Sequence, residues 1–160
     1  MDLSVTLSGQ THDLTLKNPI LTASGTFGYG LEFATYGDLA SLGGMVVKGL
    51  SLQAREGNPT PPIVETTAGV LNEGVLQNDG VDVFCVQKLP MLPWQETPVI
   101  ANIYAASVED FGQLAARLND EEGVAALEVN VSCPNVREGG IAFGQDPRML
   151  AQVTSAVRGA

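Results

Sequence analysis

The chain has 160 residues, a formal net charge of −10 and 44% apolar residues, a composition typical of a globular domain with a hydrophobic core. Its 8 Lys and Arg residues against 18 Asp and Glu residues disfavour a nucleic-acid binder, which needs clustered cations to displace phosphate counterions. No apolar run approaches the ~20 residues that span a bilayer. Two cysteines make no disulfide framework, so a reducing cytoplasm is the expected location.

The first part of the chain predicts a hairpin, a buried strand, a helix and a second buried strand. Residues 3–9 (LSVTLSG) and 12–18 (HDLTLKN) alternate apolar and polar side chains around a short turn, the pattern of two antiparallel strands. Residues 20–24 (ILTAS) and 44–48 (GMVVK) are short apolar runs bounded by Pro or Gly, which is typical of buried strands. The segment 31–43 between them predicts a helix.

The middle of the chain opens with a long segment, residues 49–80, which is interrupted by prolines and glycines. A loop of this length in a compact domain is usually functional or disordered. Residues 81–92 (VDVFCVQKLPML) then predict a helix or a pair of turns. Cys85 lies there among apolar neighbours and is predicted to be a structural residue.

The last part of the chain alternates strands and helices more clearly. A buried strand is predicted at residues 98–102 (PVIAN), and a helix follows from Ser107, because serine is a favoured N-cap and apolar residues then recur at helical spacing. Another buried strand is predicted at residues 126–132 (ALEVNVS). The final helix opens with Asp146 as its N-cap and Pro147 at its first position.

Strands that alternate with helices at this spacing form parallel βαβ units, in a doubly wound sheet or in part of a (β/α)8 barrel. A polar residue stands near the C-terminal end of each predicted strand: Ser24, Lys48, Asn102 and Asn130. Because (β/α)8 enzymes build their active sites from several strand ends at once, this pattern favours the α/β barrel. Four units make half of a barrel, so residues 1–160 are expected to be the truncated N-terminal half of a single TIM (β/α)8-barrel domain, with an N-terminal β-hairpin.

The most informative segment is residues 128–140 (EVNVSCPNVREGG). Pro134 prevents the chain from continuing directly into a helix after Cys133, and Gly139-Gly140 completes a loop able to fold over a ligand. An exposed thiol on such a loop can act as a base or a nucleophile if its surroundings favour the thiolate. A lone cysteine is more often a small structural residue, so the residue pattern alone leaves both interpretations open.

Several segments resemble, in order and spacing, the class 1 dihydroorotate dehydrogenases, and the B-type branch fits best. Residues 130–136 (NVSCPNV) with 143–147 (FGQDP) resemble the catalytic loop of that family. Residues 18–30 (NPILTASGTFGYG), 46–66 (VVKGLSLQAREGNPTPPIVET) and 98–103 (PVIANI) resemble its first three barrel strands and the turns that follow them. The likeness covers essentially the whole chain.

The resemblance implies a set of site residues, with Cys133 as the catalytic base. The residues implied to bind the cofactor FMN are Ser24, Lys48, Gly49, Asn102 and Asn130. The residues implied to bind the substrate are Lys48, Asn72, Glu73, Gly74, Val75, Leu76, Asn130 and Asn135. Asparagine suits these roles because its amide both donates and accepts hydrogen bonds, as the imide-like edges of flavin and pyrimidine require. No metal ligand is implied.

The implied reaction is the FMN-dependent oxidation of dihydroorotate to orotate in de novo pyrimidine (UMP) biosynthesis. Cys133 takes a proton from C5 while a hydride leaves C6 for N5 of the flavin. In B-type enzymes the electrons pass to a partner subunit with FAD and an iron–sulfur cluster, and then to NAD; this chain has too few cysteines to hold such a cluster itself. The full-length form is expected to be a homo-oligomer.

One segment departs from the family pattern, and two alternatives stay open. In residues 72–78 (NEGVLQN), Val75 stands where the family has glycine, and Glu73 adds a carboxylate close to an anionic substrate. One alternative is an inactive, truncated half-barrel fragment. The other is a related flavin barrel: the acidic charge disfavours a tRNA dihydrouridine synthase, but the dihydropyrimidine dehydrogenase barrel shares the flavin and cysteine pattern.

Overall fold

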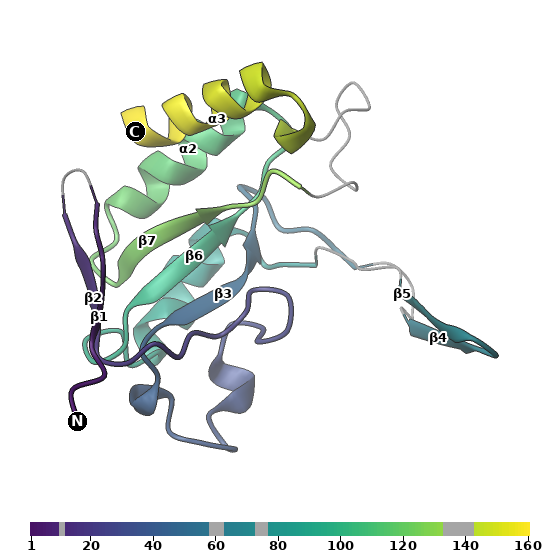
Figure 1. Ribbon diagram of the computed structural model, residues 1–160. Helices are drawn as coiled ribbons and strands as arrows, with labels where there is room; N and C mark the ends of the chain where they lie inside the picture. The colour runs from purple at the N-terminus through teal and green to yellow at the C-terminus, as the bar shows by residue number, and fades with distance from the viewer. Residues whose placement is uncertain (10–11, 58–62, 73–76, 133–142) are drawn as a thin grey trace.

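The centre of the molecule is a parallel sheet of three strands in the order β3-β6-β7 (Figure 1). The computed structural model describes residues 1–9, 12–57, 63–72 (the backbone alone for 63 and 70–72), 77–132 and 143–160. The strands of this sheet are β3 (Met45–Leu50), β6 (Val99–Ile103) and β7 (Val124–Val129). Each pairs in parallel with its neighbour. The class is therefore mixed α/β with parallel strands, as the sequence predicts, while closure into an eight-stranded barrel stays a prediction.

Helices connect the strands and pack on the sheet (Figure 1). The connection from β3 to β6 includes three successive helical turns: α1 (Val81–Val83), the π-helical η3 (Phe84–Lys88) and the 3-10 turn η4 (Leu89–Met91). α2 (Val108–Asn119) links β6 to β7 and packs against the terminal α3 (Pro147–Gly159), which follows the 3-10 turn η5 (Phe143–Gln145). Within the described residues no helix is both long and apolar enough to cross a membrane.

Both long helices begin where the sequence predicts. Ser107 Oγ accepts a hydrogen bond from the Asp110 N–H at 3.1 Å, and Asp146 Oδ1 accepts one from the Arg148 N–H at 2.8 Å. These bonds satisfy amides that have no partner inside a helix. Pro147 occupies the first position of α3, where no amide hydrogen bond is lost.

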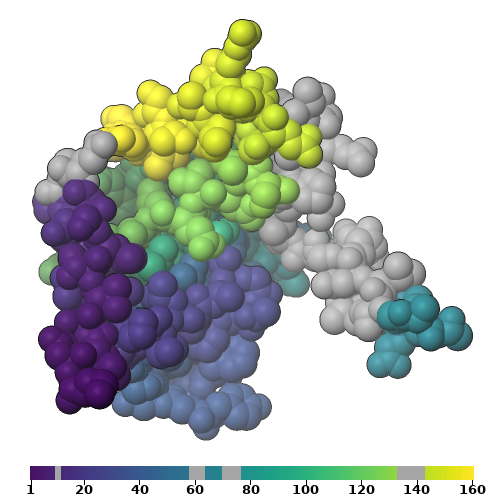
Figure 2. All heavy atoms as spheres, in the orientation of Figure 1, coloured from purple at the N-terminus to yellow at the C-terminus, as the bar shows by residue number. Residues whose placement is uncertain are grey.

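The described residues also form two antiparallel hairpins outside the central sheet. The predicted N-terminal one pairs β1 (Val5–Leu7) with β2 (Leu14–Leu16). The second pairs β4 (Ile63–Thr66) with β5 (Gly69–Asn72), inside the long segment for which the sequence predicts only a loop. Figures 1 and 2 show that β4 and β5 stand away from the rest of the described chain, on the side toward which the strands of the sheet point.

The N-terminal hairpin closes the amino-terminal end of the sheet. The Lys17 ammonium, directly after β2, donates to the carbonyl oxygens of Ala40 and Glu96, the latter at 2.9 Å, and to Thr97 Oγ1 at 3.2 Å. Thr97 is fully buried just before β6 begins. Since this end of the sheet is covered, the carboxyl end is left for a site.

The two faces of the sheet differ because side chains alternate along each strand. One face packs on the helices, and its buried cluster comprises, among others, Met45, Val47, Val99, Ala101, Ile103, Phe84, Phe111 and Leu114. Val46, Ile100 and Asn102 alternate with these residues and belong to the opposite face, while the register of β3 against β6 shifts between Val47 and Leu50, where Lys48 lies. The candidate residue Asn102 therefore lies on the face that the helices do not cover.

A matched pair of leucines tests this placement of the core. Leu114 of α2 is fully buried, whereas Leu150 of α3 is 39% exposed. Leu114→Ala is expected to lower the free energy of unfolding by about 2–5 kcal/mol, because burial is lost and a cavity remains. Leu150→Ala should cost less than about 1 kcal/mol. Urea unfolding followed by circular dichroism measures both, and equal losses would contradict the placement.

The prediction of a strand at residues 20–24 is wrong for this structure. Leu21 makes a single parallel bridge to Gly44. The Thr22 hydroxyl accepts from the Val46 N–H at 2.8 Å and donates to the Val46 carbonyl at 3.0 Å, in place of a regular ladder. Leu21 is 40% exposed. The segment is therefore attached to β3 through the Thr22 side chain, and its apolar residues Ile20 and Leu21 stay exposed.

The predicted helix at residues 31–43 is also wrong. Two short 3-10 turns take its place, η1 (Leu31–Phe33) and η2 (Leu39–Ser41). Gly37 lies between them and is a poor helix former. The Asp38 side chain caps the second turn, because its Oδ1 accepts a hydrogen bond from the Ala40 N–H at 2.9 Å. These two residues therefore divide the segment.

Candidate active site

The carboxyl ends of the three parallel strands lie side by side. Strand pairing continues to the ends of β3, β6 and β7, so Lys48, Asn102 and Asn130 reach the same edge of the sheet. β7 ends at Val129, three residues before the predicted end, but the Asn130 N–H still donates to the Ile103 carbonyl at 2.9 Å. We call this edge, with its three polar residues, the rim.

Asn102 and Asn130 also share one face. Asn102 alternates with core residues of β6, and Asn130 continues the alternation of β7, whereas Lys48 lies at the register shift of β3. Asn102 is 4% exposed, while Lys48 and Asn130 are half-buried. The structure therefore brings together three of the residues that the sequence predicts to contact the cofactor.

Ser24 lies next to this group although its segment is not a strand. Thr22, two residues earlier, is bonded to Val46 of β3, and Gly28, four residues later, accepts from the Lys48 N–H at 2.8 Å. The half-buried Ser24 lies between these two points of attachment. Its backbone therefore turns beside the end of β3, close to Lys48.

Glu128 is a rim residue that the sequence analysis did not single out. Asn102 Nδ2 donates to Glu128 Oε1 at 2.5 Å across the β6–β7 pair, where the two residues lie opposite each other. The carboxylate fixes which end of the amide is the donor, and so orients the Asn102 side chain. The signal was present, because Glu128 precedes Asn130 by two residues in one strand and must share its face.

Gly49 is closely packed. A Cβ at this position would lie 3.0 Å from Tyr104 Cδ1 and 3.1 Å from Asn102 Oδ1, tighter than most real contacts of this kind. Protein atoms therefore already occupy the space beside Gly49. Its predicted contact with the cofactor stays a prediction.

The predicted substrate segment is only partly described. Asn72 ends β5, and of this residue the structure describes the backbone alone. The other predicted residues of this segment lie outside the described residues: Glu73, Gly74, Val75 and Leu76. No contact of theirs tests the prediction.

Asn78 anchors the chain just after that segment. It is 3% exposed, its Nδ2 donates to Tyr104 Oη at 2.7 Å and to Ser51 Oγ at 2.9 Å, and its Oδ1 accepts from the Gly80 N–H at 2.9 Å. Ser51 follows β3 and Tyr104 follows β6. The C-terminal end of the predicted substrate segment is therefore held at the carboxyl ends of these two strands.

The predicted catalytic loop is also only partly described. Cys133 and Asn135 lie outside the described residues. Asn130 Oδ1 accepts from the Ser132 N–H and hydroxyl, both at 3.2 Å. Ser132, the residue directly before Cys133, is thus bonded to the rim residue Asn130. The predicted catalytic loop therefore starts at the rim.

Cys85 has the structural role that the sequence predicts. It is 4% exposed, and burial, followed by the nearby Glu121 carboxylate, raises the pKa of its thiol from the ordinary value of 9.0 to about 11. The neutral thiol therefore stabilises the fold below pH 9.0, and this contribution is lost as the pH rises through about 11.

A labelling experiment tests this thiol. Because burial raises the pKa of the Cys85 thiol to about 11, few Cys85 side chains are ionised at pH 8 in the folded chain, and the thiolate is the reactive species. Iodoacetamide should therefore modify Cys85 at least about 100-fold more slowly in the folded chain than in urea, as measured by peptide mass spectrometry. Cys133 serves as the internal comparison in the same sample. A Cys85 that reacts equally fast in both states would contradict the burial.

The groups at the rim fit a flavin better than a metal. Among the described residues, no cluster of His, Cys, Asp and Glu could hold a metal ion. The donor set comprises the Lys48 ammonium, the amides of Asn102 and Asn130, and the Ser24 hydroxyl. The imide-like edge of a flavin presents both hydrogen-bond acceptors and a donor, which these groups complement.

Comparison with known proteins agrees with this arrangement. The family model for dihydroorotate dehydrogenase matches residues 6–160. Over 158 residues the chain is 64% identical to the dihydroorotate dehydrogenase B (NAD(+)) catalytic subunit of Maridesulfovibrio salexigens and 62% identical to that of Solidesulfovibrio magneticus. It is 53% identical over 157 residues to that of Citrifermentans bemidjiense. These matches cover 98–99% of this chain and 50% of each relative, so the chain spans about half the length of the curated relatives it matches. The chain belongs to the dihydroorotate dehydrogenase family.

Proposed function

We propose that this chain forms the N-terminal half of the barrel of an FMN-dependent enzyme that oxidises dihydroorotate to orotate in the cytoplasm. The single observation that carries the proposal is the rim. In a member of this family, Lys48, Asn102 and Asn130 converge from three parallel strands on one edge, at the end of the sheet that the N-terminal hairpin leaves open. Sites of (β/α)8 enzymes are built at this end.

Five residues would hold FMN: Ser24, Lys48, Gly49, Asn102 and Asn130. The Lys48 ammonium would complement negative charge on the flavin ring, and the two amides would bond its imide-like edge. Glu128 supports this role because it fixes the orientation of the Asn102 amide. When bound, FMN supplies the acceptor for the hydride that leaves C6 of dihydroorotate.

The chain itself would bind the substrate and remove a proton. The Lys48 ammonium would pair with the substrate carboxylate, and polar groups of residues 72–76 and Asn135 would orient the pyrimidine ring. The Cys133 thiolate would take the proton from C5. The loop that carries Cys133 starts at the rim through the Ser132–Asn130 bonds, which supports this assignment.

A partner subunit would receive the electrons. The relatives are named catalytic subunits of an NAD(+)-linked enzyme, which supports a separate electron-transfer subunit for this chain as well. By the resemblance, that subunit would carry FAD and an iron–sulfur cluster and reduce NAD, and the catalytic subunit would be a homo-oligomer. An iron–sulfur cluster needs four protein ligands, usually cysteines, and this chain has two.

Anaerobic reduction of the flavin tests the proposal. The complete gene product that carries this chain is loaded with FMN and mixed with dihydroorotate, without any electron acceptor. The flavin absorbance should bleach, and one orotate should form per flavin. Dihydrouracil, which lacks the carboxylate, should bleach the flavin far more slowly. Bleaching by dihydrouracil but not by dihydroorotate would instead favour a dihydropyrimidine dehydrogenase.

A further inference from the structure

The ammonium groups of two lysines lie near one aromatic ring, that of Tyr29, beside the rim. Lys48 Nζ lies 5.5 Å from the centre of the Tyr29 ring, and Lys88 Nζ lies 4.8 Å from the same centre. Both distances are within the range in which a ring face attracts a cation. Tyr29 is 5% exposed and its ring stacks on Phe84 with centroids 5.9 Å apart, so the core fixes the position of the ring.

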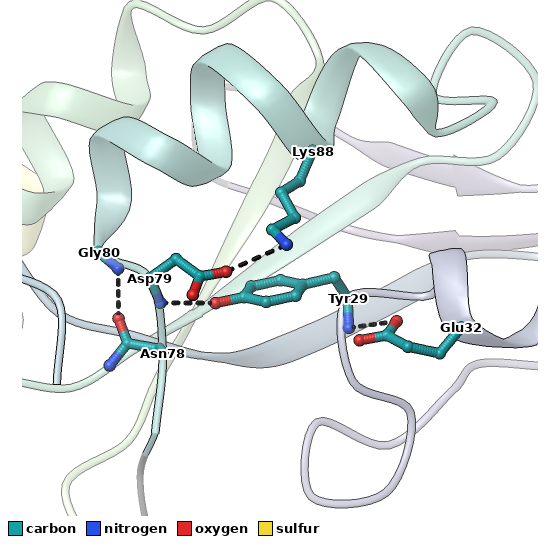
Figure 3. Close-up of polar contacts among 6 residues, drawn as sticks. All are labelled: Tyr29, Glu32, Asn78, Asp79, Gly80 and Lys88. Atoms are coloured by element: carbon teal, nitrogen blue, oxygen red, sulfur yellow. Dashed lines mark hydrogen bonds and ion pairs between the residues drawn. The ribbon is translucent and has the colours of Figure 1, made fainter. Parts of the chain in front are cut away.

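The polar groups of Tyr29 are held as well (Figure 3). The Asp79 N–H donates to Tyr29 Oη at 3.0 Å, and the Tyr29 N–H donates to Glu32 Oε2 at 3.1 Å. Burial raises the pKa of the Tyr29 hydroxyl above its ordinary value, so the hydroxyl stays neutral. The ring is therefore an uncharged and well-fixed contact for the two lysines.

The two lysines differ in how their charges are balanced. Lys88 Nζ lies 3.1 Å from Asp79 Oδ2, as Figure 3 shows, so the charge of Lys88 is paired. None of the described side chains forms an ion pair with Lys48. A carboxylate beside Lys48 would hold it in place but cancel its charge, whereas an aromatic ring holds it and leaves the charge available.

We propose that Tyr29 is the positioning residue for Lys48: its ring holds the ammonium at the rim without neutralising it, and Asp79 neutralises the second ammonium on the same ring. The consequence for substrate binding rests on the proposed function, in which Lys48 meets an anion. Asp79 directly follows Asn78, which anchors the end of the predicted substrate segment. The Asp79–Tyr29 hydrogen bond therefore ties that segment to the ring that places Lys48.

Lysine NMR tests the placement without any activity. The chain contributes three lysines, Lys17, Lys48 and Lys88, whose side-chain signals in the complete gene product can be assigned one by one with Lys→Arg variants. The ring current of Tyr29 should move the Lys48 and Lys88 signals upfield of their positions in the urea-unfolded chain. Tyr29→Phe should keep this displacement, and Tyr29→Leu should abolish it.

A control and a contrary result complete this test. Tyr36→Leu removes a ring that is 86% exposed in the same part of the chain, and it should move none of the three signals. A Lys48 signal that is the same in the folded and unfolded wild-type chain would overturn the inference, whether or not Tyr29→Leu folds. So would a folded Tyr29→Leu chain in which the Lys48 signal does not move.

Steady-state kinetics of the complete gene product, with FMN and its electron-transfer partner, test the consequence. Tyr29→Leu should raise the KM for dihydroorotate by about threefold to tenfold, the loss expected for one cation–π contact, whereas Tyr29→Phe should stay within about twofold of wild type. An equal KM in wild type and Tyr29→Leu would refute the positioning role. A wild-type enzyme that does not turn over dihydroorotate would refute the proposed function, while the NMR result would still decide the placement of Lys48.

Discussion

Cys133→Ser is expected to slow the reduction of bound flavin by dihydroorotate by about 100-fold to 10,000-fold near neutral pH, the range in which a general base contributes. A serine hydroxyl is a far weaker base than a thiolate, so the proton at C5 would no longer be removed efficiently. Flavin content should not change, because the groups proposed to hold FMN stand on the strand ends. Anaerobic stopped-flow absorbance of the complete gene product measures the rate.

Cys85→Ala is the matched control for this variant. Cys85 lies in the core on the helix-covered side of the sheet, so its loss should reduce stability while the rate of flavin reduction stays near that of wild type. The rate of the Cys133→Ser variant should recover in part at high pH, where hydroxide can take the proton. Full activity of Cys133→Ser at neutral pH would remove Cys133 from the mechanism.

Lys48→Met is expected to lower kcat/KM for dihydroorotate by about 100-fold or more, which is the effect of removing one well-placed donor to developing charge. Methionine keeps much of the side-chain length and volume but not the charge. Lys48→Arg should recover part of the loss, because the cation returns with a different shape. Steady-state kinetics over a range of substrate concentrations separate the effect on KM from the effect on kcat.

Lys17→Met controls for the general loss of a lysine. Lys17 lies at the opposite, amino-terminal end of the sheet, where it bonds to Glu96 and Thr97. This variant should unfold at a lower urea concentration but keep the kcat/KM of wild type. If Lys48→Met affected only stability in the same way, Lys48 would have no role in binding substrate or flavin.

The elements that the sequence predicted correctly are those decided by local chemistry. β3 and β6 are apolar runs between Gly or Pro residues, and α2 and α3 begin at side chains that cap their own first turns. Residues 20–24 have the same apolar character as β3, but Leu21 makes a single bridge to Gly44, and the Thr22 side chain bonds the Val46 backbone in place of a regular ladder. Local composition does not contain that information.

The site residues also differ in whether the sequence could predict their positions. Lys48, Asn102 and Asn130 could be placed together from the sequence, because parallel strands bring their carboxyl ends to one edge. Tyr29 and Asp79 could not, because their contact joins residues 50 positions apart through the fold. The spacing of Glu128 and Asn130 places both on one face, but the Asn102–Glu128 bond itself depends on the register of two strands.

The most direct test is a crystal structure of the complete gene product with FMN and orotate bound. We predict that Cys133 Sγ faces C5 of the pyrimidine from the same rim as Lys48 and Asn102, with Lys48 Nζ near the orotate carboxylate and the ring of Tyr29. A Cys133 sulfur inside the packed core, or at the end of the sheet covered by the N-terminal hairpin, would contradict the account.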